Sequence, residues 1–145
     1  MKTKKFFIIY IEALVCYFIT CWGRMLSIQE HVWMDTVAFF LLSMLVVKMN
    51  SEKMSVSKIG AAVIMGRLSL DIVILSLYFY SSLSAFVSNV PCCVAIILGC
   101  SVAKRGVRVR DFIFVFIAQC AVNIWSIHVF LPYLEEIWHQ NQSTI

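Results

Sequence analysis

Charged residues are scarce in this chain, and long hydrophilic segments are missing. Asp, Glu, Lys and Arg make up 14% of the 145 residues, against about 25% in soluble globular domains. Hydrophobic residues account for 61%, which is more apolar surface than a soluble domain of this length needs. This composition excludes an ordinary soluble domain. It also excludes nucleic acid as a partner, because binding would require a folded, basic, soluble surface.

Sequence motifs for catalysis are missing as well. The chain contains no GxSxG, no HExxH and no glycine-rich phosphate loop. His31, His128 and His139 fall near one predicted side of the protein, and Glu135 and His139 have the i,i+4 spacing of a ligand pair. That segment is also typical of an interfacial helix end. We therefore expect no enzyme, no metal site and no cofactor.

Five long apolar runs are what the chain does contain. They cover residues 6–22, 32–47, 59–80, 84–102 and 112–131, each about 16 to 22 residues long. At about 1.5 Å per helical residue, such runs approach the roughly 30 Å hydrocarbon thickness of a bilayer. Only helices with internally satisfied backbones cross lipid at this length. The sequence therefore predicts an all-α, polytopic bundle of five transmembrane helices, with residues 1–145 as a single membrane domain.

The distribution of basic residues predicts the orientation of this bundle. Ten of the twelve lie in alternate gaps: Lys2, Lys4, Lys5, Lys48, Lys53, Lys58, Lys104, Arg105, Arg108 and Arg110. The other gaps contain only Arg24, and Arg67 lies within a run. Because cytoplasmic loops retain Lys and Arg, we expect a cytoplasmic (inner or plasma) membrane protein with its N-terminus inside and its C-terminus outside.

Aromatic residues agree with this orientation. Six of them fall near the predicted outer boundary: Trp22, Trp33, Tyr78, Tyr80, Tyr133 and Trp138. Amphipathic rings favour that level of a membrane. The Lys-rich start also suits a signal peptide, but Glu12 interrupts the first run and no small-x-small cleavage site follows. We therefore expect an uncleaved first helix.

Small residues form a stripe on the fourth predicted helix. The stripe consists of Ser84, Ser88, Cys92, Ala95 and Gly99. Such stripes allow the backbones of membrane helices to approach closely. Pro91 lies in the same run and predicts a kink, because its missing N–H leaves a carbonyl that neighbouring groups must satisfy.

Three charged residues deep inside the runs are the strongest functional signal. An ionised side chain in hydrocarbon costs about 2.5–3.5 kcal/mol even on a mild insertion scale, so Glu12, Arg67 and Asp71 need partners or water. Arg67 and Asp71 are four residues apart and share a helix face. We predict an intramembrane Glu12–Arg67–Asp71 cluster, with Gln119 and Asn123 nearby as neutral partners.

This cluster admits three interpretations. It can be a polar pathway or binding site, in which a carboxylate carries a proton or the arginine holds an anion. It can be an ion pair that fixes the register of the helices. Its charges can also face another subunit, and all three alternatives stay open from the sequence.

The six cysteines all lie within predicted spans. Cys92 and Cys93 are adjacent and form a candidate thiol pair, but no CxxC occurs, which is the usual spacing of a thiol relay. Cysteine is also a small, soft residue that packs well between helices. Packing is therefore the favoured role.

Three functions are compatible with these features. The first is a non-enzymatic subunit or accessory component of a larger membrane complex. The alternative is an oligomeric carrier or channel for a small solute or proton, and the second alternative is a membrane thiol-redox protein. Because five short helices enclose little interior, we expect the partners to be the lipid bilayer and either other membrane subunits or further copies of the chain.

Overall fold

The computed structural model describes residues 2–21, 28–50, 54–77, 86–106 and 108–144. Helices dominate these segments: α1 (Lys2–Cys21), α2 (Ile28–Asn50), α3 (Val56–Leu77), α5 (Asn89–Arg105), α6 (Val109–Trp125), the π-helix η1 (Ser126–Phe130) and α7 (Leu131–Ser143). The last three form one continuous helix of 35 residues. The described segments contain no strand, so the predicted all-α fold is confirmed.

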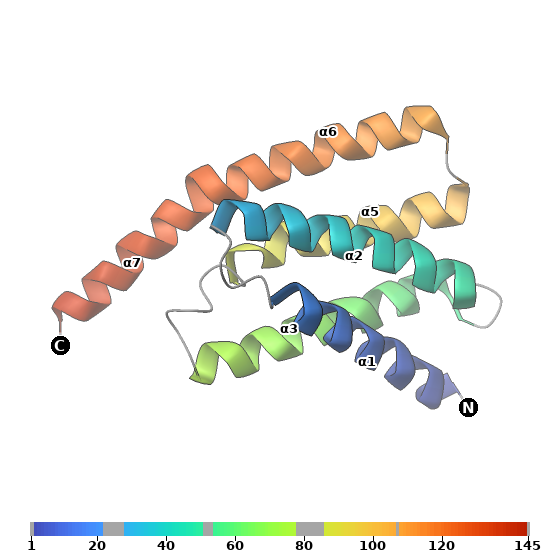
Figure 1. Ribbon diagram of the computed structural model, residues 1–145, viewed down its shortest axis with the longest axis horizontal. Coiled ribbons are helices and arrows are strands. Elements are labelled where there is room, and N and C mark those ends of the chain that lie inside the picture. Colours follow the sequence, from blue (N-terminus) through green and yellow to red (C-terminus); the bar gives the residue numbers. More distant parts are fainter. Residues whose placement is uncertain (1, 22–27, 51–53, 78–85, 107, 145) are drawn as a thin grey trace.

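Four of the helices form a bundle, and the fifth rod lies against its side. α2 packs along α5, α1 packs along α3, and α3 also contacts α2 and α5. α6 lies outside this group, mainly against α5, and α7 extends past the end of the bundle (Figure 1). The long rod therefore has far fewer neighbours than the helices beneath it.

Successive helices run in opposite directions (Figure 1). The first residues of α1, the facing ends of α2 and α3, and the facing ends of α5 and α6 consequently lie at one end of the molecule. The described basic residues of the predicted inner loops belong to these helix ends: Lys4, Lys5, Lys48, Lys58, Lys104, Arg105, Arg108 and Arg110. Lys53, Arg24, Trp22, Tyr78 and Tyr80 lie outside the described residues.

Two helices are long and apolar enough to cross a membrane. They are α2 and the continuous helix Val109–Ser143. The other three helices, α1, α3 and α5, coincide with the remaining predicted runs. α5 has only 17 residues, which is short for a membrane-spanning helix. α1 and α3 carry ionisable residues well inside their lengths, namely Glu12, Arg67 and Asp71. Length and composition therefore identify two of the five predicted spans.

The small-residue stripe on α5 brings this helix close to α2. Ser88, Cys92, Ala95 and Gly99 are all buried, and Ser84 lies outside the described residues. A Cβ atom placed on Gly99 would lie 2.7 Å from the carbonyl oxygen of Phe40 and would collide with the hydroxyl of Ser43. Only glycine permits this approach without displacing the backbone of α2.

A second close contact joins α1 to α3. A Cβ atom placed on Gly66 would lie 2.8 Å from both the Cβ of Ala13 and the carbonyl oxygen of Tyr10. The buried face of α1 consists of Ile9, Ala13 and Tyr17, which recur every four residues and so share one side of the helix. These residues belong to the apolar core formed with α2, α3 and α5.

Pro91 lies in the first turn of α5, as its third residue, and not in the helix interior. Proline is tolerated there, but it cannot donate to the carbonyl four residues earlier, which belongs to Val87. The hydroxyl of Ser126, on η1, donates to that oxygen at 2.7 Å. The predicted need for a replacement donor is thus met by the neighbouring rod.

Burial in this molecule runs opposite to that of a soluble protein. Arg67 and Asp35 are completely buried, whereas large apolar side chains are exposed on every helix of the bundle and on α6. On α2 the exposed set forms a continuous stripe of Met34, Val37, Leu41, Leu45 and Met49. Exposed apolar surface on this scale marks contact with lipid or protein.

Candidate functional site

The guanidinium of Arg67 is the centre of a buried polar cluster. Arg67 is the twelfth of the 22 residues of α3, so it lies near the middle of the helix. Its Nη2 atom is 3.1 Å from Oδ2 of Asp35 on α2, and its Nη1 atom is 3.5 Å from Oδ1 of Asp71, one turn along α3. One arginine therefore faces two carboxylates.

Ser88 connects Arg67 and Asp35. Its hydroxyl accepts a hydrogen bond from Nη2 of Arg67 and donates to Oδ2 of Asp35 at 3.0 Å. On the other side of Asp35, Nδ1 of His31 lies 3.4 Å from Oδ1. His31 and Asp35 are one turn apart on α2, and His31 is the fourth residue of that helix.

Aromatic rings enclose the remaining surface of the guanidinium. The Cζ atom of Arg67 lies 3.9 Å from the ring centroid of Tyr17 on α1 and 5.5 Å from that of Phe39 on α2. A cation over a ring face is attracted by the ring quadrupole, most strongly where water is excluded. With Ser88 at the N-cap of α5, the cluster takes side chains from all four helices of the bundle.

Gln119 and Asn123 form a second, neutral chain beside this cluster. Gln119 donates to Oδ1 of Asn123 and to the Pro91 carbonyl, both at 3.0 Å. Asn123 donates to the hydroxyl of Thr36 at 3.2 Å, and Thr36 is the residue after Asp35. The chain attaches α6 to α2 and α5, next to the charges rather than in contact with Arg67 or Asp71.

Glu12 lies apart from the cluster. It is half-buried, and no ion pair reaches it within the described part of the chain. The face of α1 that packs on the bundle is the Ile9–Ala13–Tyr17 face, and Glu12 lies on its flank. Tyr17 consequently occupies the position toward Arg67 that the sequence suggested for Glu12.

Asp35 is a member of the cluster that the sequence prediction does not include. The predicted run begins at residue 32, which places Asp35 near its outer end, whereas α2 already begins at Ile28. The i,i+4 pair His31–Asp35 and the Asp35–Phe39–Ser43 face were available signals. A second acid was also needed, because a buried arginine at midspan requires several partners.

The cysteines whose side chains the structure describes lie between helices or on their flanks, and the side chain of Cys21 lies outside the described part. Cys92 is completely buried in the core, and Cys93 is partly exposed. Cys16, Cys92, Cys93, Cys100 and Cys120 are all free thiols. Among the described residues, no group of three or more His, Cys, Asp or Glu side chains is arranged to hold a metal ion.

No protein-family model matches this chain, and no curated protein or solved structure matches it either. The site is therefore interpreted from its own geometry. An enclosed arginine, two carboxylates and a histidine can cross-link helices and can exchange a proton.

Proposed function

We propose that this protein is a non-enzymatic subunit of a larger membrane complex, embedded as five transmembrane helices. The observation that carries the proposal is the uncovered state of the long rod. α6 buries only Val115 and Asn123, and α7 buries no residue at all. A helix of this length with so little packing of its own is suited to contact a partner.

Embedding in lipid is supported by the inverted pattern of burial. The charged cluster lies inside and the apolar stripes lie outside, as expected where the surrounding solvent is hydrocarbon. The alternation of helix directions gathers the basic helix ends at one end of the bundle (Figure 1), which favours that end as the cytoplasmic one.

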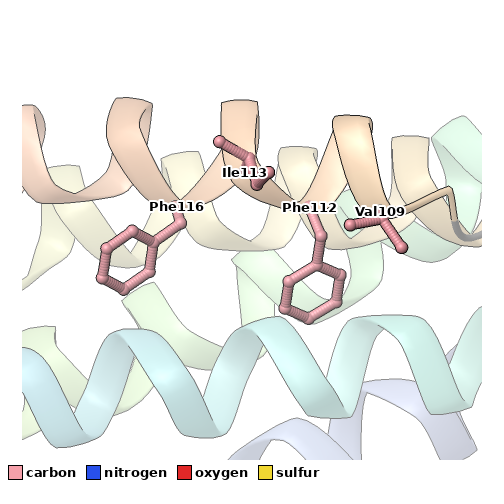
Figure 2. A pocket seen from close by; sticks show the side chains of 4 residues that line it. All are labelled: Val109, Phe112, Ile113 and Phe116. Carbon is pink, nitrogen blue, oxygen red and sulfur yellow. The ribbon is translucent and has the colours of Figure 1, made fainter.

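The docking face we propose lies on α6 and consists of Phe112, Ile113, Phe114, Phe116 and Ile117. Phe114 is 71% exposed and Phe116 66%. Val109, Phe112, Ile113 and Phe116 line an open apolar groove of about 430 Å³, and the rings of Phe112 and Phe116 point to the side of α6 on which α2 lies (Figure 2). The edge of this groove is fixed by an edge-on contact between Phe112 and Phe40, with ring centroids 6.0 Å apart.

The partner that fits this face is a transmembrane helix with basic residues beyond its outer end. A 35-residue helix is about 52 Å long, which exceeds the roughly 30 Å hydrocarbon layer. α7 therefore extends past the lipid core, and its exposed Glu135 and Glu136 provide an acidic surface there. The charged cluster has a separate role in this proposal, which is to hold α1, α2, α3 and α5 in register.

Site-specific photocrosslinking in native membranes tests the proposal. A photoreactive residue at Phe114 or Ile117 is expected to give a crosslinked membrane protein, and one at Val37 or Leu41 on the lipid-facing stripe of α2 is the matched control. Glu135→Lys with Glu136→Lys should weaken the Phe114 crosslink. Equal labelling at both faces, or a chain that purifies alone from mild detergent, would contradict a subunit role.

A second candidate function is an oligomeric carrier of protons or a small solute. The observation that favours it is the excess of acids over Arg67 inside the bundle, together with the position of His31, which is 7% exposed in the second turn of α2. Proton flux into vesicles that contain the purified protein tests it. The carrier proposal requires flux that Asp71→Asn abolishes while the protein still assembles, and absence of flux would exclude it.

A further inference from the structure

The buried cluster does not balance its charge with the ordinary ionisation states of its residues. Arg67 contributes one positive charge, and Asp35 and Asp71 contribute two negative charges. With His31 neutral, the enclosed group carries a net charge of minus one. An uncompensated charge is unfavourable in a buried site with little exposure to water, and it becomes more so in lipid.

Other titratable side chains around the cluster do not correct this imbalance. On the described residues they are a phenol and thiols: Tyr17 and Cys16 on α1, and Cys92 and Cys93 on α5. At their ordinary pKa values these groups are uncharged near neutral pH. α6 contributes the neutral Asn123, through Thr36. Counted over the described residues, the cluster is therefore one positive charge short, and the simplest species that supplies it is a proton.

We propose that the cluster binds one exchangeable proton, held either on the carboxyl group of Asp71 or on the imidazole of His31. On Asp71 the proton forms an O–H bond and leaves one carboxylate facing Arg67. On His31 it forms the second ring N–H bond and gives an imidazolium beside Asp35. Water supplies and accepts the proton, and either arrangement makes the whole cluster neutral.

The geometry distinguishes the roles of the two carboxylates. Asp35 is contacted by Arg67 at 3.1 Å, by the Ser88 hydroxyl at 3.0 Å and by His31 at 3.4 Å. Asp71 faces Arg67 at the longer distance of 3.5 Å, with the neutral donors Tyr17 and Asn89 as its other neighbours. Because Asp35 is completely buried and lies closer to the guanidinium, it remains the fixed anion, and Asp71 is the carboxyl that accepts the proton.

His31 and Asp71 are the two ionisable members of the cluster that keep some exposure. His31, the fourth residue of α2, is 7% exposed and Asp71 is 4% exposed, whereas Arg67 and Asp35 are completely enclosed. A proton that arrives at His31 neutralises the cluster without reaching Asp71, and deprotonation of His31 requires Asp71 to be protonated. This inference concerns the occupancy of the cluster and does not depend on whether α6 docks a partner.

Solid-state NMR in lipid bilayers tests the proposal directly. The chain contains only three aspartates, Asp35, Asp71 and Asp111, so selective ¹³Cγ-aspartate labelling gives three carboxyl signals. Asp111, at the basic end of α6, serves as the reference and is assigned with Asp111→Asn. Side-chain ¹⁵N-histidine labelling reports the state of His31 in the same sample.

At neutral pH the proposal requires one bound proton in total: either a protonated Asp71 with neutral His31, or an ionised Asp71 with doubly protonated His31. Asp35 is ionised in both cases. Two ionised aspartates with neutral His31, or two protonated aspartates, would overturn it. Asp71→Asn removes the imbalance, so His31 should then be neutral at pH 7, and a charged His31 in this variant would also overturn the proposal.

Discussion

Arg67 shows how the cost of a buried charge determines the structure around it. Removing an ion pair from water costs more than its attraction returns, so such pairs contribute little to stability, yet deletion of one partner is strongly destabilising. Here the guanidinium is bound by residues from α2, α3 and α5 and stacked on Tyr17 from α1. The cluster consequently contributes more to the alignment of these helices than to the stability of the bundle.

Replacement of Asp35 by asparagine is expected to destabilise the bundle by about 1–3 kcal/mol, because Arg67 and Ser88 lose the charged acceptor that they share while Asp71 still balances the charge of Arg67. Glu12→Gln is the matched control. Glu12 has no ion pair among the described residues, so its neutralisation should change stability by less than about 0.5 kcal/mol. Thermal unfolding of both variants in lipid nanodiscs measures the difference. If both variants lost the same stability, Glu12 would have to interact with the buried charges as Asp35 does.

The sequence pointed to the correct central residue but not to its full environment. Arg67 and Asp71 were identified because four-residue spacing within an apolar run is visible without a structure. Asp35 was not, because its burial depends on where α2 begins, and Tyr17 was not, because a 3.6-residue periodicity does not tell which face of an apolar helix packs inward. Contacts between helices decide both questions.

At the scale of the helices, small residues and replaced hydrogen bonds determine the packing. Gly99 allows the backbone of α2 to approach α5 closely, and Gly66 allows the backbone of α1 to approach α3 closely. In hydrocarbon there is little hydrophobic drive for helices to associate, so close packing and interhelical hydrogen bonds carry the association. Each of these contacts can be tested with a substitution of only a few atoms.

Gly99→Ala is expected to destabilise the bundle by about 1–3 kcal/mol, since the added methyl overlaps Ser43 and the Phe40 carbonyl. Gly60→Ala is the control, because its nearest neighbour would be Cys100 Sγ at an ordinary 3.6 Å. Alanine should be neutral or slightly stabilising there. Unfolding of the two variants by a denaturing detergent provides the comparison. A Gly99→Ala protein as stable as the parent would show that α2 and α5 are not so close.

The hydrogen bond from Ser126 to the Val87 carbonyl predicts a coupling with Pro91. Ser126→Ala should cost about 0.5–2 kcal/mol, because the carbonyl that Pro91 leaves free loses its donor. In a Pro91→Ala background the helix supplies its own N–H, so the same substitution should cost less. A double-mutant cycle on the free energy of unfolding measures the coupling. Additive effects would mean that Ser126 does not replace the missing donor.

The five helices could be located from the sequence, because apolar runs of this length are unambiguous. Their ends could not, and the last helix differs most, since the predicted run stops at residue 131 whereas the helix continues to Ser143. Pro132 cannot donate to the His128 carbonyl. The chain adapts through the π-turn η1, in which the Leu131 N–H bonds to the Ser126 carbonyl five residues back. Such a local widening leaves no trace in hydrophobic periodicity.

At the scale of the whole molecule, the alternation of basic residues and the alternation of helix direction agree. The chain reverses between successive helices, which brings the Lys- and Arg-bearing helix ends together, while the exposed Glu30, Glu135 and Glu136 lie toward the other end (Figure 1). The proposed five crossings would account for both patterns.

Accessibility labelling tests this topology. Single cysteines at Ser57 and Arg108, introduced into a cysteine-free background, are expected to resist a membrane-impermeant thiol reagent in intact cells, because both positions lie at the basic end. A cysteine at Gln140 on α7 should react. Labelling after permeabilisation is the control for buried thiols. External reactivity at position 57 or 108 would reverse the proposed orientation.

The attachment of α6 also completes hydrogen bonds of the bundle. Three of its side chains, Gln119, Asn123 and Ser126 of the adjoining η1, bond to groups on α2 and α5. Without the last helix, the Val87 carbonyl lacks the donor that Ser126 supplies, and the Pro91 carbonyl and the Thr36 hydroxyl lose their amide partners. A bundle without its last helix is therefore incomplete in its hydrogen bonds as well as in its packing.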